Sequence, residues 1–548
     1  MFFPLTRSWL CRATLFLLLA ASASAVEPLP EQIDRLIAAK AGAQPLATRA
    51  DDAEFLRRAW LDFAGDLPTA EQARAFFADS APDKRARLIG QLIDAPRFGE
   101  RLADALHVML MERRGEDAKW RAYLADACRA NKPWDVMARE ILYPDYLDAN
   151  QRGAGFFSIN RLEKVGQQTT DYPGLTRDAG RMFLGVDLQC AQCHNHLTVK
   201  SYKQADFNGL FVAFQNAKIE KASGDYATSW ISEGAISAKY DFVSVLTAVK
   251  GQTGPRVPFA EEVPIPELKG DEMWVVKPDK KKNQPGKPKF SPLQEIAARV
   301  ATKDNPWFVR NIANRAWWLL MGRGLVEPLD LHHAANPASH PEVLDLLASE
   351  LVAHNFDLKW LIRELALTQT YQRSSQLPEG AGQPPEELFA VAKERPLSAE
   401  QLARAFLRAT GEWERVSANT KADAQDDAKR YALSDFESAF RSAFANAPKE
   451  PELTVNPTLR SALFLRNSEH VLWASKPRPG NLVERLAALP DNAQVAGELY
   501  LSILTRPPTT EERSEMVAWL EKQGADRPRA IGHGAWALLS SAEFFSNH

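Results

Sequence analysis

The chain has 548 residues, of which 45% are hydrophobic and 25% are charged, and its formal net charge is −3. Because single domains commonly hold ~100–200 residues, this length predicts two or three domains. The composition is that of a globular protein and excludes a chain that is mostly disordered. The slightly negative charge gives no indication of a nucleic-acid partner.

The first 25 residues have the pattern of a secretory signal peptide. Arg7 and Arg12 precede a short apolar run at 13–20, and small residues in an A-x-A pattern end at Ala25. The run is well short of the ~20 residues that a membrane span needs, which favours a cleaved signal over an anchor. Cleavage near Ala25 removes two arginines and takes the net charge from −3 to −5. We therefore expect an exported protein, periplasmic or secreted, without a stable transmembrane anchor.

Residues 26–220 are expected to form a first helical domain. Apolar residues recur at helical spacing, as at Ile33 and Ile37, and again at Leu56 and Trp60. Further on, a capping box is formed by a threonine and the glutamine three residues later, Thr69 and Gln72.

Residues 221–290 have a different character and are expected to form a small β-containing insertion followed by a linker. Apolar and polar residues alternate over 240–245, and several prolines follow. The run 277–289 then contains six lysines and three prolines. Such a run is either a docking patch for an acidic surface or a solvated linker, and we favour the linker.

Residues 291–548 return to helical periodicity and are expected to form a C-terminal helical domain. Asn305 is expected to cap a helix that ends at Gly322. Further helix starts are predicted at Ser339 with Glu342, at Asp357, at Ser398 with Gln401, and at Thr509 with Glu512. The sequence thus predicts a mainly α fold, with two helical domains separated by a small β-containing insertion and a Lys/Pro-rich linker.

The sharpest chemical feature is the motif C-x-x-C-H at Cys190, Cys193 and His194. Two thiols at this spacing can form thioethers to one haem, and the adjacent histidine can serve as the proximal ligand of its iron. Only four cysteines are present, and Cys11 leaves with the signal peptide, so an exported chain of this size is not a disulfide scaffold. The motif and the export signal both favour covalently attached haem c.

Other uses of the same segment remain open. Cys190 and Cys193 could form a disulfide, and together with His194 and His196 they could hold zinc or another metal ion. No hydrolase, P-loop or dinucleotide-binding motif is present elsewhere, so no catalytic residue is assigned.

A sixth ligand for a haem iron is not evident. The candidates are Met182, His107, Met109 and Met111, but each is more simply explained as a core residue. His332, His333 and His340 flank a proline-containing loop, where a surface metal site would lack an acidic partner at helical spacing. Cys128 is expected to be a buried small apolar residue.

Many segments resemble the paired planctomycete-type domains of unknown function numbered fifteen-forty-nine and fifteen-fifty-three, which are described as cytochrome-associated. For the first domain the resemblance is carried by 33–37, 61–69 and 176–189, which lead into 190–196. For the second it is carried by 305–310, 314–315, 322–328, 336–341, 370–375, 499–509 and 541–545. Asn195 and Leu197 stand where the resemblance leads us to expect Asp and Pro. The resemblance implies no established activity.

Two functions are therefore considered. The first is an exported mono-haem c-type cytochrome-like protein that transfers electrons or serves as the redox partner of another, unidentified exported protein. The alternative is an exported helical binding or scaffold protein with a structural metal or a disulfide at the Cys/His segment.

Overall fold

The computed structural model describes residues 27–163, 170–279, 281–282, 284–377, 380, 382–450, 458–523 and 526–548. The expected signal peptide, residues 1–25, lies outside the described residues. Within the described part, no helix combines the length and apolar character that a membrane crossing requires.

The fold is mainly α, as the sequence predicts, and the strands of the described residues form short antiparallel pairs. The N-terminal helices are α1 (Leu29–Ala41), α2 (Asp52–Phe63), α3 (Ala70–Ala78), α4 (Lys84–Asp94), α5 (Pro96–Met111), α6 (Ala118–Arg129), α7 (Trp134–Leu142), α8 (Phe156–Leu162), α9 (Tyr172–Ala179) and α10 (Gln204–Phe214). The next group comprises α11 (Pro292–Val300), α12 (Pro306–Met321), α13 (Pro341–Ala353), α14 (Leu358–Leu367) and α15 (Gln369–Gln372). The C-terminal group comprises α16 (Ala399–Thr410), α17 (Trp413–Ser417), α18 (Leu433–Phe444), α19 (Leu459–Asn467), α20 (Glu469–Ala474), α21 (Leu482–Ala487), α22 (Asn492–Leu504), α23 (Thr510–Lys522), α24 (Arg527–Leu539) and α25 (Ala542–Phe545).

Most of the predicted helix starts are confirmed. The capping boxes at Thr69, Ser398 and Thr509 are formed in both directions, so that each pair satisfies two otherwise free backbone N–H groups. The exception is Ser339. Helix α13 begins one residue later than expected, with His340 at the N-cap and Pro341 in the first turn, and no side chain caps it. The expected capping box at Ser339 is therefore wrong.

The apolar residues form two clusters that do not divide the chain at the insertion. The first cluster unites buried residues of α1 to α10 with those of α11 to α15. The second is built from α16 to α25, with Leu61 and Leu67 added from the N-terminal part. Residues 291–548, expected as one C-terminal domain, are thus shared between two hydrophobic clusters.

In the insertion, the strands of the described residues pair as three hairpins. Strand β1 (Ala217–Glu220) pairs with β2 (Trp230–Glu233), and β3 (Tyr240–Val243) pairs with β4 (Lys250–Thr253). The lysine-rich run begins just after β5 (Trp274–Val276) and returns to it as β6 (Lys287–Pro288). The described residues of the run expected as a linker therefore belong to a hairpin.

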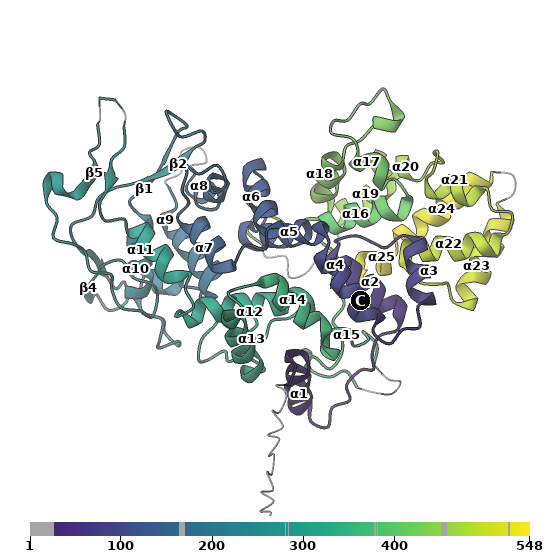
Figure 1. The fold of residues 1–548 in the computed structure, drawn as a ribbon, viewed down its shortest axis with the longest axis horizontal. Coiled ribbons are helices and arrows are strands. Elements are labelled where there is room, and N and C mark those ends of the chain that lie inside the picture. Colours follow the sequence, from purple (N-terminus) through teal and green to yellow (C-terminus); the bar gives the residue numbers. More distant parts are fainter. Residues whose placement is uncertain are drawn as a thin grey trace, which may run out of the picture.

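Figure 1 shows how these parts are arranged. The insertion lies at one end of the molecule and the helices of the second cluster lie at the other, with α5, α12 and α14 between them. The last pair of strands joins distant parts of the chain, because β7 (Arg395–Pro396) pairs with β8 (Ser546–Asn547) beside α2. The C-terminus is thereby fixed near the centre of the fold.

Candidate functional site

The C-x-x-C-H motif lies on a single tight turn at the surface. Residues Cys190–Gln192 form a 3₁₀ turn, and the backbone N–H groups of Cys193 and His194 both donate to the carbonyl oxygen of Cys190, over 3.3 and 3.4 Å. Because side chains three residues apart eclipse one another in a 3₁₀ turn, the two thiols share one side of it. Both cysteines are exposed and neither is in a disulfide. The turn thus presents two accessible thiols together.

The histidine of the motif has its imidazole fixed in one tautomer. Its Nδ1 lies 2.7 Å from the carbonyl oxygen of Asn195. A carbonyl can only accept, so Nδ1 carries the proton and the lone pair is left on Nε2. Histidines that bind metals commonly donate their other ring N–H to a carbonyl or a carboxylate in this way. His194 therefore presents Nε2 as a potential ligand.

His196 is fixed in the opposite tautomer. Its Nδ1 accepts from the backbone N–H groups of Thr198 and Val199, over 3.3 and 2.9 Å, which places the proton on Nε2. Its ring also packs edge-on against Tyr202, and Tyr202 packs in the same way against His333. His196 is therefore arranged to hold the loop after the motif, and its Nε2 has no free lone pair in this tautomer.

Among the described residues, no contact joins any of the four candidates for a sixth ligand to this turn. Both ring nitrogens of His107 are engaged, with Trp120 at 3.0 Å and Glu116 at 3.2 Å. Met111 is buried beside Arg161. Met109 and Met182 line a cavity that does not include the cysteines.

The remaining histidines do not form the surface metal site considered from the sequence. Burial lowers the pKa of His332 and of His340 to about 4, so both rings are neutral near pH 7. His333 is half-buried, and burial together with the nearby His196 lowers its pKa. In the part of the chain that the structure describes, no three His, Cys, Asp or Glu side chains gather closely enough to hold a metal ion.

Exposed apolar side chains lie around the motif, a feature that the sequence analysis missed. The loop after strand β3 is tied to the turn, because the backbone N–H of Val245 donates to the carbonyl oxygen of Cys193 over 3.0 Å. Val245 is 69% exposed and Leu197 is 76% exposed, and the same loop exposes Leu246 and Val249. Exposed apolar side chains that lie together often mark a site where a ligand or another protein binds. This surface could not be predicted from the sequence, because the hydrogen bond between Val245 and Cys193 joins residues that are far apart in the chain.

The segment just before the motif is held by the second half of the chain. Val186 forms a β-bridge with Leu331, and the backbone N–H of Asp187 donates to the carbonyl oxygen of Asp330 over 2.9 Å. After the motif, the hydroxyl of Tyr202 donates to the carbonyl oxygen of His332 over 2.9 Å. Residues 330–332 therefore support the motif from both sides.

A network of charged side chains, most of them buried, includes the first residue of this segment, Asp330. Arg181 pairs with Glu112 at 2.5 Å, with Asp178 at 3.1 Å and with Asp330 at 2.9 Å. Burial alone would lower the pKa of Arg181, but the three carboxylates raise it above its ordinary value. Arg315 adds an ion pair to Asp330. The network keeps Arg181 charged and ties the two halves of the chain together.

The fold and the site define a mainly helical protein with a surface C-x-x-C-H turn held between its two halves. Residues 32–219 belong to the family PSCyt2, described as a protein of unknown function (DUF1549), and residues 294–520 belong to the family PSD1, described as a protein of unknown function (DUF1553). This confirms the resemblance found in the sequence. No curated protein and no solved structure matches the chain.

Proposed function

We propose that the protein is an exported mono-haem c-type cytochrome-like protein, which transfers electrons to or from another exported protein. The observation that carries the proposal is the arrangement of the turn: two exposed, unpaired thiols on one side, followed by a histidine whose Nδ1 is held by a backbone carbonyl. This combination fits the attachment of haem. Cys190 and Cys193 would hold it by thioether bonds, and Nε2 of His194 would ligate its iron.

The surroundings of the turn support the same proposal. Haem supplies one-electron redox chemistry when it is bound. The exposed Leu197 and Val245 offer an apolar surface beside the cysteines, on which a flat apolar group can pack. The hydrogen bonds of the 330–332 segment keep the turn in place. The names of the matched domains hint at an association with cytochromes but assign no activity.

The proposal is tested by producing the full chain, with its own leader, in a bacterial host that has cytochrome c maturation machinery. We expect covalent haem on a denaturing gel and a Soret band that shifts on reduction. The double variant Cys190→Ala/Cys193→Ala should lose covalent haem, whereas Cys128→Ala should keep it. Colourless wild-type protein with both thiols free would contradict the proposal.

The same preparation distinguishes the proposed haem protein from the alternative, which is an exported helical binding or scaffold protein with a structural metal or disulfide at this segment. One zinc ion per colourless chain, lost in Cys190→Ala/Cys193→Ala and retained in Cys128→Ala, would support the metal form. A mass lower by two protons without haem or metal would support the disulfide.

A further inference from the structure

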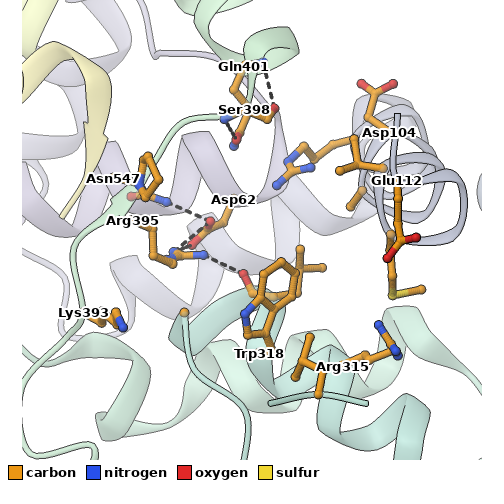
Figure 2. Close-up of a pocket in the computed structure, with 18 of the residues that line it drawn as sticks. Asp62, Asp104, Glu112, Arg315, Trp318, Lys393, Arg395, Ser398, Gln401 and Asn547 are labelled. Atoms are coloured by element: carbon orange, nitrogen blue, oxygen red, sulfur yellow. Dashed lines mark hydrogen bonds and ion pairs between the residues drawn. The ribbon is translucent and has the colours of Figure 1, made fainter. Parts of the chain in front are cut away.

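A cavity of about 460 Å³ lies where the two hydrophobic clusters meet (Figure 2). It is bounded by helices α5 and α12, by the loop that leads into α16, and by the C-terminal strand β8. Its volume is in the range of ~300–1,000 Å³ that is typical of small-molecule sites, and such sites often form between domains. Much of the wall is apolar: Ala105, Val108, Met109, Met182, Trp318, Leu319, Pro328 and Leu329.

Most of the charged groups of the wall are paired, either within the wall or with residues behind it. Figure 2 shows Arg395 and Asn547 converging on Asp62, with Trp318 beside them. Asp62 accepts from Arg395 over 2.7 and 3.0 Å, from Asn547 over 2.8 Å, and from the hydroxyl of Tyr371 over 2.9 Å. The other buried carboxylates are held by arginines: Asp104 by Arg121 and Arg404, Glu112 by Arg114 and Arg181, and Asp330 by Arg181 and Arg315.

Arg101 is the exception among the buried charged residues of this wall. It is only 9% exposed, yet within the described residues its guanidinium makes no hydrogen bond and no ion pair, and its Nε is a buried donor without an acceptor. Burial lowers the pKa of Arg101, and the carboxylates of Asp62 and Asp104 partly oppose this from a distance. A buried donor without an acceptor is costly, because the water that it loses on burial is not replaced by a protein acceptor. The guanidinium of Arg101 is therefore a hydrogen-bond donor group without an acceptor among the described residues.

We propose that this cavity binds a small organic monocarboxylate, with its carboxylate on the guanidinium of Arg101 and its apolar body against Met109, Met182 and Trp318. A carboxylate matches the planar fork of an arginine and can accept two parallel hydrogen bonds. The apolar wall excludes a ligand that is polar throughout. The nearby negative charges of Asp62 and Asp104 disfavour a dianion such as phosphate more than a monoanion. The proposal does not depend on haem attachment.

The test measures binding of benzoate to the full chain by calorimetry and by the shift in melting temperature, with benzamide and inorganic phosphate as comparison ligands. We expect saturable binding of benzoate alone. The variant Arg101→Met should bind benzoate at least about tenfold more weakly, because a charge-assisted bidentate contact is lost. Without ligand it should melt no lower than the wild type, because no protein partner is left unpaired. Arg529→Met, which removes an exposed arginine of α24, should change neither property.

A second variant keeps the test decisive if Arg101→Met does not fold. Arg101→Lys keeps the charge but not the fork, so we expect benzoate binding weaker than in the wild type and stronger than in a variant without charge. The proposal is overturned if benzoate fails to bind, if benzamide or phosphate binds as tightly, or if the arginine variants bind benzoate like the wild type.

Discussion

Arg181 donates from Nε to Oδ2 of Asp330 over 2.9 Å, and this contact joins the PSCyt2 region to the PSD1 region at the segment that also binds the backbone of Asp187, just before the C-x-x-C-H turn. The same arginine reaches Glu112 and Asp178, so one cation connects three carboxylates, each of which also pairs with another arginine. The turn is therefore supported by the second region through charge as well as through the backbone contacts of 330–332.

We expect Arg181→Met to destabilise the protein by about 1–3 kcal/mol, because three charged hydrogen bonds are lost although each carboxylate keeps another arginine. Urea unfolding followed by circular dichroism measures the effect. Arg310→Met is the matched control, since Arg310 of α12 forms an exposed ion pair with Asp345. Its loss should cost no more than about 1 kcal/mol. Equal losses in the two variants would show that the buried network does not stabilise the fold.

Local signals in the sequence predicted the elements, whereas contacts between distant residues could not be predicted. Three capping boxes were found because each depends on residues three positions apart. The C-x-x-C-H turn was found for the same reason. The unpaired state of Arg101 and the exposed surface around Val245 depend on residues far apart in the chain, and no spacing in the sequence encodes them. The shared first hydrophobic cluster escaped prediction likewise, because helical periodicity shows which face is buried but not its partner.

Ser398 and Ser339 are expected to contribute differently to the stability of the protein. Ser398 accepts from the backbone N–H of Gln401 over 3.3 Å and starts α16, whereas Ser339 lies outside α13 and caps nothing. We expect Ser398→Ala to lower the free energy of unfolding by about 1 kcal/mol. Ser339→Ala should change it by less than about 0.5 kcal/mol. Chemical denaturation of both variants checks this, and a larger loss at Ser339 would mean that the helix begins where the sequence suggested.

Stability should fall on acidification because of His332. Burial is the main cause that lowers the pKa of this ring to about 4, and the nearby Arg315 adds to it. The unfolded chain, with an ordinary histidine pKa near 6.5, binds a proton between these values that the folded protein does not. The contribution of His332 is therefore fully present above about pH 6.5 and is lost as the pH falls towards 4.

The size of this effect follows from linkage. Between pH 7 and pH 5, we expect His332 to lower the free energy of unfolding by about 1–2 kcal/mol. In His332→Asn, the free energy of unfolding should therefore decrease between pH 7 and pH 5 by about 1–2 kcal/mol less than in the wild type. His354→Asn, which removes a more exposed histidine, should leave the drop as in the wild type. An unchanged drop in His332→Asn would mean that this ring does not titrate as its burial requires.

The thiols of Cys128, Cys190 and Cys193 should differ sharply in reactivity. Cys190 and Cys193 are exposed, whereas Cys128 is buried, and burial together with the nearby Asp104 raises its pKa to about 12. Since the thiolate is the reactive form, a shift from 9 to about 12 lowers its fraction at neutral pH on the order of a thousandfold. In haem-free protein that lacks residues 1–25, a thiol reagent should modify two cysteines quickly and the third only in denaturant. Haem-loaded protein should show no fast thiol, because both would be consumed in thioethers. Fast modification of Cys128 in the native protein would contradict its burial, and fast thiols in the loaded protein would contradict attachment at Cys190 and Cys193.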